Sequence, residues 1–163
     1  MSEATVRTSA YDDPHAVTLI GQVQAEYVQM YGGPDTAPVD PAEFAAPSGT
    51  FLVAYDPDDV PVAMGGWRRH DSADTSWASP AAEIKRMYVA PQARGRGLAR
   101  LVLAELERTA AQDGIHWLLL ETGSRQPAAI ALYRSAGYAD VPPFGHYAET
   151  ELSVHLGKRL TSD

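Results

Sequence analysis

A strand-loop-helix-strand unit in the middle of the chain constrains the fold most. Residues 82–89, AEIKRMYV, have the pattern of a strand, and QARGRG leads from them into residues 98–113, LARLVLAELERTAAQD. Apolar side chains recur along one face of this second segment, which predicts an amphipathic helix that ends at Gly114. HWLLLE follows as an apolar run with the length of a buried strand. The unit therefore predicts a mixed α/β sheet in which the strands at Ile84 and Trp117 run parallel.

The rest of the chain predicts further strands and helices around this unit. Strands are expected at 5–11, 51–55 and 62–69, with two more in 138–141 and 150–160. Helices are expected at 14–30, with Asp13 as its cap, and at 126–137, with a short one at 41–44 in an irregular loop. Residues 71–80 read as a polar loop. Because no composition break separates these elements, we expect one domain over residues 1–163.

Composition excludes several classes of function. The chain has no cysteine, so it has no disulfide framework, thiolate nucleophile or cysteine-rich zinc site, and its five histidines show no HExxH spacing. A formal net charge of -8 argues against a broad nucleic-acid surface. No segment approaches the ~18 uninterrupted apolar residues of a membrane span, and the N-terminus has no signal-peptide pattern. We therefore expect a cytoplasmic protein without metal, nucleic-acid or membrane partners.

The loop at residues 92–100 gathers positive charge in this acidic chain. Every charged residue between Glu83 and Glu105 is basic, namely Lys85, Arg86, Arg94, Arg96 and Arg100. Gly95 and Gly97 allow a tight turn, and the first N–H groups of the following helix lack partners inside it. Such a helix start attracts anions, which predicts a phosphate-bearing ligand. The alternative is an ordinary glycine-rich turn, because the P-loop and the dinucleotide fingerprint are both absent.

Residues 83–138 resemble the GNAT acyl-CoA N-acetyltransferases. The resemblance rests on the strand EIKRMYV, the pattern Q/R-x-x-G-x-G/A met by Arg94, Gly97 and Ala99, the strand LLLET and the helix AIALYRSAGY. The N-terminal half matches that family only in the order of its elements. The resemblance implies a single-domain α/β (α+β) fold with a mostly antiparallel sheet of six to seven strands, flanking helices and a central parallel pair that splays apart.

The resemblance also implies acetyl-CoA as co-substrate. Its pyrophosphate would lie on the loop and helix start formed by Arg94, Gly95, Arg96, Gly97, Leu98, Ala99 and Arg100, mainly on backbone amides. Its pantetheine arm would pair with the backbone of Met87, Tyr88 and Val89 in the gap between the splayed strands. Gln126 stands where the family usually has asparagine, and it offers the same amide groups on a longer arm.

Acetyl transfer to an amine needs a base for the ammonium and an acid for the departing thiolate. Glu83 and Glu121 are the two carboxylates in strand context, and we favour Glu83, which lies six residues before Val89. Tyr133 resembles the general acid of the family. The alternatives are carboxylates paired with neighbouring basic side chains and a tyrosine that only packs in the core.

The acceptor is expected between the region of the first helix and the loop before the last strand. These segments contain no lysine or arginine, but they hold Glu26, Asp35, Asp40, Glu43, Glu149, Glu151, Tyr27, Tyr31, His146 and Tyr147. An acidic, aromatic rim suits a cationic primary amine of a small molecule or a protein. The alternative to an N-acetyltransferase is a non-catalytic acyl-CoA-binding sensor or interaction module. The sequence leaves open whether the protein forms a homodimer.

Overall fold

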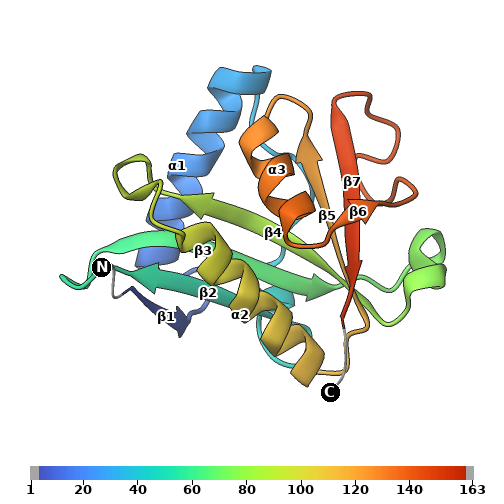
Figure 1. Ribbon diagram of the computed structural model, residues 1–163, viewed down its shortest axis with the longest axis horizontal. Helices are drawn as coiled ribbons and strands as arrows, with labels where there is room; N and C mark the ends of the chain where they lie inside the picture. The colour runs from blue at the N-terminus through green and yellow to red at the C-terminus, as the bar shows by residue number, and fades with distance from the viewer. Residues whose placement is uncertain (1–3, 161–163) are drawn as a thin grey trace.

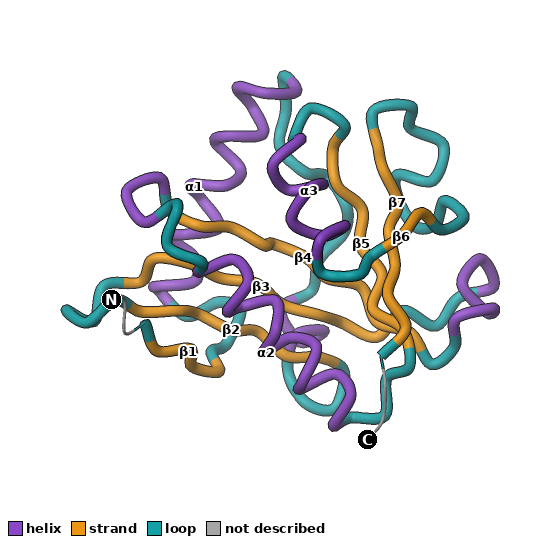
Figure 2. The backbone as a smooth tube through the Cα atoms, in the orientation of Figure 1, coloured by secondary structure: helices purple, strands orange, loops and turns teal. Residues whose placement is uncertain are grey.

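The computed structural model describes residues 4–160 of the chain, shown in Figures 1 and 2. The strands are β1 (Thr5–Thr8), β2 (Gly49–Tyr55), β3 (Pro61–Arg69), β4 (Ala81–Val89), β5 (Trp117–Gly123), β6 (Ala139–Asp140) and β7 (Ser153–Arg159). The helices are α1 (Pro14–Tyr31), α2 (Leu98–Gln112) and α3 (Pro127–Ser135), and short 3-10 turns lie at η1 (Pro41–Phe44), η2 (Ala73–Ala78) and η3 (Pro91–Ala93).

All seven strands form one sheet in the order β1-β2-β3-β4-β5-β7-β6. Neighbouring strands pair antiparallel, except β4 and β5, which run parallel and are joined through α2. This arrangement confirms the predicted mixed, mostly antiparallel sheet with a central parallel pair.

Helices cover both faces of the sheet and bury a core on each. On the first face, the apolar side of α2 packs with residues of α3 against the sheet. The buried residues of this core include Val102 and Leu106 of α2 and Tyr133 of α3. On the opposite face, α1 packs through Ala16, Leu19 and Val23 with Phe44 against β2, β3 and β4. In Figure 1, α2 and α3 lie in front of the sheet and α1 lies behind it. We call these the α2 face and the α1 face.

The two parallel strands separate soon after they meet. β4 and β5 pair at three positions only, from Ala81–Trp117 to Glu83–Leu119. Beyond this point β4 continues to Val89 and β5 to Gly123 without pairing, and Figure 1 shows the strands diverging. The gap leaves the edge of β4 that faces β5 without backbone partners after Glu83. This confirms the splay that the family resemblance implied.

A β-bulge in β4 changes where its side chains point. The register with β3 shifts between Met64 and Gly66, and Arg86 has a φ of 63°. Ile84 packs on the α2 face, so Lys85 points to the α1 face by strand alternation. Without a bulge Arg86 would return to the α2 face, yet its side chain also reaches Asp35 on the α1 face. The bulge therefore lets two consecutive basic side chains reach one carboxylate.

Two segments differ from their predicted structure. The first strand ends at Thr8 rather than residue 11, because the chain turns there toward Asp13, whose side chain caps α1 through the His15 N–H. The expected loop at 71–80 contains the 3-10 turn η2. Buried Thr75 stabilises this turn, since its hydroxyl lies within hydrogen-bond distance of the His70 and Ser72 carbonyls.

Candidate active site

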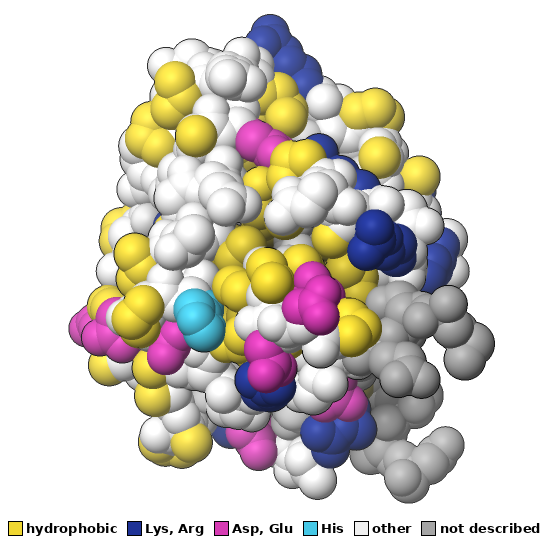
Figure 3. Space-filling view, turned by 90° about the vertical axis from the view of Figure 1, so that its left-hand side faces the viewer, with side chains coloured by type: hydrophobic (Ala, Val, Ile, Leu, Met, Phe, Trp, Pro, Cys, Tyr) yellow, Lys and Arg dark blue, Asp and Glu magenta, His cyan; other side chains and the backbone are white. Residues whose placement is uncertain are grey.

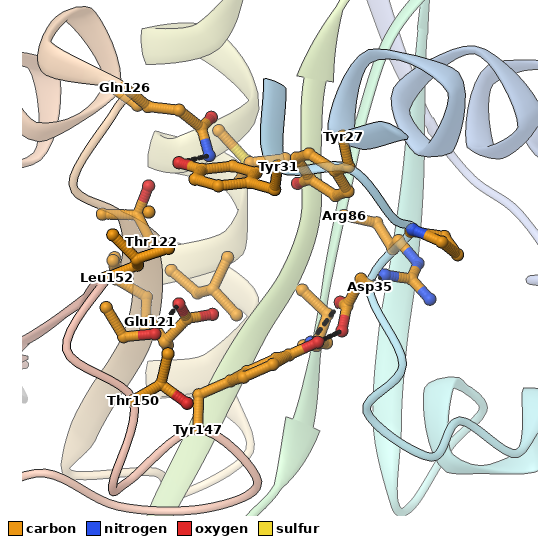
Figure 4. Close-up of a pocket in the computed structure, with 18 of the residues that line it drawn as sticks. Tyr27, Tyr31, Asp35, Arg86, Glu121, Thr122, Gln126, Tyr147, Thr150 and Leu152 are labelled. Atoms are coloured by element: carbon orange, nitrogen blue, oxygen red, sulfur yellow. Dashed lines mark hydrogen bonds and ion pairs between the residues drawn. The ribbon is translucent and has the colours of Figure 1, made fainter. Parts of the chain in front are cut away.

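A cavity of about 290 Å³ lies where β4 and β5 separate (Figure 4). Residues of β4 and β5 line it from the two sides of the gap, α1 and α3 contribute from above, and the loops before η1 and before β7 close it. The lining residues are Tyr27, Tyr31, Gly33, Pro34, Asp35, Thr36, Ile84, Lys85, Arg86, Met87, Leu120, Glu121, Thr122, Gly123, Gln126, Ala129, Tyr133, Tyr147, Thr150, Leu152 and Ser153. Residues from positions 27 to 153 of the sequence thus meet at one place.

The glycine-rich loop presents free backbone amides beside this gap. Gly95 and Gly97 have φ angles of 81° and 77°, which favour glycine, and Gly97 is the N-cap of α2 without a side-chain cap. An added Cβ at either glycine would meet nothing within 4 Å, so the space in front of the loop is open. The first N–H groups of α2 therefore face that space without intrahelical partners, as an anion site requires.

The arginines of this loop are exposed, but two of them have protein partners. Arg94 donates to the Val89 carbonyl at 3.0 Å and to Glu26 at 2.8 Å, and Arg100 donates to the Ser135 hydroxyl at 2.6 Å. Leu98 is buried in the core of the α2 face, while Ala99 is half-buried. Figure 3 shows basic and acidic side chains interspersed on one face of the molecule. Arg96 is exposed and forms no hydrogen bond or ion pair within residues 4–160, so the loop amides and this guanidinium are both available to a phosphate.

The free edge of β4 lies between this loop and the cavity. Met87 lines the cavity, whereas the Tyr88 side chain is buried on the α1 face, with its hydroxyl 3.2 Å from Gln22 and 3.4 Å from Glu26. The Tyr88 side chain is therefore directed away from the gap, and the Val89 carbonyl already accepts a hydrogen bond from Arg94. An unpaired strand edge can pair with an extended ligand.

α3 places Tyr133 and Gln126 at the cavity. Tyr133 is 5% exposed, and its hydroxyl forms no hydrogen bond within residues 4–160. Burial, with a smaller contribution from Tyr27, raises the pKa of Tyr133 well above its ordinary value, so the phenol stays protonated at neutral pH. Gln126 reaches toward Tyr31, with 3.5 Å between the amide nitrogen and the tyrosine oxygen (Figure 4).

Glu121 is the strand carboxylate that lines the cavity. Burial raises its pKa, although the hydrogen bond from the Ser153 hydroxyl at 2.7 Å and the nearby Lys85 charge act in the opposite direction. A carboxylate with a raised pKa accepts a proton more readily, which suits a general base near neutral pH.

Glu83, the candidate that the sequence favoured, does not line the cavity. One of its oxygens accepts hydrogen bonds from the Arg68 guanidinium at 3.1 and 3.3 Å and lies 3.9 Å from the His70 ring. Glu83 is 7% exposed, so this is a buried ion pair. The alternative reading of Glu83 as a carboxylate with a basic partner therefore agrees with its surroundings, although the partner comes from β3.

The expected acidic rim is partly neutralised, because Asp35, Glu26 and Glu43 pair with basic residues of other elements. Asp35 pairs with Lys85 at 2.7 Å and with Arg86 at 2.6 Å. Burial acts to raise the pKa of Asp35, but Lys85 and the hydrogen bonds from Lys85, Tyr147 and the Ala37 N–H hold it well below its usual range. Glu26 pairs with Arg94, Glu43 pairs with Arg68, and Asp40 caps η1.

Sequence reasoning missed Lys85 and Arg86 as residues of the cavity. The sequence assigns both to the positive region around the glycine-rich loop and, in the alternative reading, to ion pairs with the strand glutamates. Within residues 4–160, no group of side chains could hold a metal ion, and no helix has the length and apolar character to cross a membrane.

The fold and the site combine an unpaired strand edge, between two parallel strands that separate, with a glycine-rich loop at a helix start. Residues 20–138 match the model of the acetyltransferase (GNAT) family, and the chain belongs to this family. A relative named IAA acetyltransferase, from Azospirillum brasilense, is 47% identical over 78 residues, which are 48% of this chain and 51% of the relative. The match thus spans about half the length of that relative.

Solved structures support the same family. A candidate acyl-CoA N-acyltransferase from Klebsiella pneumoniae has a TM-score of 0.79 and 31% identity, with 98% of this chain and 99% of that chain covered. A candidate acetyltransferase from Salmonella typhimurium, solved with acetyl-CoA, shares the fold with a TM-score of 0.66 at 22% identity, covering 99% and 96% of the chains. The family uses acetyl-CoA, and these matches give no support to a non-catalytic module.

Proposed function

We propose that the protein transfers the acetyl group of acetyl-CoA to a primary amine, with Glu121 as general base and Tyr133 as general acid. One observation carries this proposal: a carboxylate with a raised pKa and a protonated phenol line the same cavity at the point where the parallel strands separate. The family supports the acetyl donor, and the amine as acceptor is our inference.

The residues present fit the donor. The amides at the start of α2 suit its pyrophosphate, and the free edge of β4 from Ile84 to Val89 suits the amide groups of its pantetheine arm. Gln126 and Met87 line the path into the cavity. When bound, acetyl-CoA supplies an acetyl thioester, whose carbonyl carbon the amine attacks.

Each proton of the reaction has a site on this chain. Glu121 takes a proton from the incoming ammonium, which frees the nitrogen lone pair for attack. The Tyr133 hydroxyl donates its proton to the sulfur as the carbon–sulfur bond breaks, and the second amine proton restores the phenol directly or through solvent. The products are the acetylated amine and the free thiol, and Glu121 releases its proton to solvent, which restores the base. Glu121 replaces Glu83 as the proposed base because Glu83 is paired with Arg68 outside the cavity.

Free-thiol release from acetyl-CoA, measured across a panel of amines, tests the proposal. Mass spectrometry of the product distinguishes N-acetylation from hydrolysis of the donor. We expect release that depends on an added amine and a product heavier by one acetyl group. The proposal fails if calorimetry shows acetyl-CoA binding while no amine class accelerates thiol release, because that result describes a binding module.

A further inference from the structure

The charged side chains that line the cavity indicate what the acceptor carries besides its amine. We propose that Lys85 and Arg86 bind an anionic group of the acceptor, such as a carboxylate, so that the acceptor is a small amino acid-like molecule rather than a polyamine or a protein lysine. This inference rests on the proposed function, because it names the substrate class of the same site.

The positive charges that line the cavity exceed the negative charges during the proposed reaction. Its lining includes two cations, Lys85 and Arg86, and two carboxylates, Asp35 and Glu121. Both cations contact the same oxygen of Asp35, at 2.7 and 2.6 Å. In the proposed mechanism Glu121 becomes neutral when it takes the proton of the ammonium. One positive charge is then in excess in a largely buried place, and an anion on the acceptor would offset it.

Both cations have donors to spare. An ammonium group has three N–H donors, and Lys85 uses one of them on Asp35. The Arg86 guanidinium donates to Tyr11 and Asp35, and its second terminal nitrogen forms no hydrogen bond within the described part of the chain. Between residues 4 and 160, the only buried side-chain nitrogen or oxygen without a partner belongs to the His155 ring. The unpartnered Arg86 nitrogen is therefore not fully buried. Because Arg86 lines the cavity, this nitrogen is the donor that we expect an acceptor anion to use.

The loops around the cavity favour a small acceptor. The Tyr147 hydroxyl donates to Asp35 at 2.6 Å and accepts from the Thr36 N–H at 2.9 Å. The His146 ring lies 3.1 Å from the Thr36 hydroxyl. These bonds join the loop after α1 to the loop before β7 over the cavity, and Figure 4 shows Tyr147 reaching across to Asp35. A volume of about 290 Å³, shared with the acetyl end of the donor, suits a small molecule.

Aromatic side chains form much of the remaining wall. Tyr27, Tyr31 and Leu152 lie at the cavity together with Tyr147. An acceptor with an apolar or aromatic body would pack against them, while its anionic group meets Lys85 and Arg86 and its amine approaches Glu121. The rim offers such an acceptor little repulsion, because Asp35, Glu26 and Glu43 are already paired with basic residues.

Matched pairs of acceptors test this inference on the unmodified protein. Phenylalanine is compared with phenethylamine and phenylalaninamide, 4-aminobutanoate is compared with propylamine, and a lysine-containing peptide represents protein acceptors. We expect kcat/KM for thiol release to be at least tenfold higher for a carboxylate-bearing amine than for its counterpart without a carboxylate. Lys85→Met should bring this ratio close to one, while acetyl-CoA affinity, measured by calorimetry, stays within about twofold.

Lys158→Met is the matched control, because Lys158 pairs with Glu107 and does not line the cavity. It should leave the ratio unchanged. If Lys85→Met does not fold, two measurements on the parent protein decide the question. One is the ratio of kcat/KM between amines with and without a carboxylate. The other is calorimetric binding of phenylalanine and phenethylamine to the CoA-bound protein.

The unfavourable outcomes are distinguishable. If amines without a carboxylate react equally well or better, the inference is wrong and the acetyltransferase proposal stands. If no amine reacts although acetyl-CoA binds, the proposed function itself fails and takes the inference with it. If Lys85→Met lowers kcat for all acceptors and leaves the ratio intact, Lys85 acts on the acetyl group and does not bind an acceptor anion.

Discussion

The Tyr147 hydroxyl donates a 2.6 Å hydrogen bond to the Asp35 carboxylate, which joins two loops that lie 112 positions apart in the sequence. The same carboxylate holds Lys85 and Arg86 of β4. One side chain thus connects the loop after α1, the loop before β7 and the bulge in the central strand. The geometry of the cavity depends on this connection.

Asp35→Asn should therefore be strongly destabilising. Removing the carboxylate leaves two buried cations without their anion, a change that costs about 3 to 5 kcal/mol in comparable buried pairs. Tyr147→Phe is the milder comparison, since it removes one hydrogen bond and should cost about 1 kcal/mol. Denaturant unfolding at neutral pH measures both. Equal and small losses would show that Asp35 is dispensable for the fold.

The pH dependence of this effect has a definite sign. The pKa of Asp35 is lowered in the folded protein, so its stabilising contribution is present above the pKa of the unfolded chain and is lost as pH falls through the folded value. The stability difference between parent and Asp35→Asn should shrink as the pH decreases below about 4. A difference that is constant with pH would contradict the ionised state of Asp35.

Glu121→Gln should lower kcat/KM and remove the acidic limb of its pH profile, with acetyl-CoA affinity nearly unchanged. The reason is that glutamine keeps the shape and burial of the side chain but cannot take the proton of the ammonium. Because burial raises the pKa of Glu121, that limb should lie above the ordinary glutamate value. Glu83→Gln is the comparison, and it should lose stability but keep the limb. The opposite result would return the base to Glu83.

Glu121→Gln should also change stability in the opposite direction to Asp35→Asn. A carboxyl group with a raised folded pKa contributes stability below its unfolded pKa, and this contribution is lost as pH rises through the folded value. The variant should therefore gain stability relative to the parent as pH rises from about 4 toward 8. Chemical unfolding at several pH values measures the gain.

Tyr133→Phe should fold like the parent and lose most of its turnover. The Tyr133 hydroxyl has no protein partner among residues 4–160, so its removal costs little stability, while a general acid commonly supplies about 10² to 10⁴ in rate. Tyr138→Phe is the matched control, because the Tyr138 hydroxyl donates to Glu107 at 2.9 Å and does not line the cavity. It should lose about 1 kcal/mol of stability and keep its turnover. If turnover of Tyr133→Phe stays within about threefold, a barrier change under ~1 kcal/mol, Tyr133 only packs.

Gly97→Val should weaken acetyl-CoA binding at least tenfold, or about 1.4 kcal/mol. A branched side chain in front of the loop amides blocks the close approach of a phosphate, and φ at this position is 77°. Gly114→Val imposes similar backbone strain at the other end of α2, where φ is 80° and no neighbour lies within 4 Å of an added Cβ. Calorimetry on both variants separates the two effects. Equal affinities would place the pyrophosphate elsewhere.

The sequence alone determined the elements and the loop. Apolar residues at helix and strand spacing predicted the central unit of β4, α2 and β5. The structure contains the same elements, because their apolar faces are buried in the core. Gly95 and Gly97 predicted a tight turn, and both have positive φ angles in the structure. Glycine adopts such angles at little cost. Such features depend on residues close together in the chain, so local physics is enough to predict them.

Only the tertiary structure shows which of the two glutamates lines the cavity and which residues are the partners of Asp35. Glu83 and Glu121 both sit in strands, but β4 and β5 still pair at Glu83 and have separated at Glu121, so only Glu121 reaches the cavity. The contact of Asp35 with Arg86 depends on one extra residue in β4, because a shift by one position moves a side chain to the other face of a sheet. Neither the point of separation nor the bulge is visible in residue spacing, since both result from how distant strands pack together.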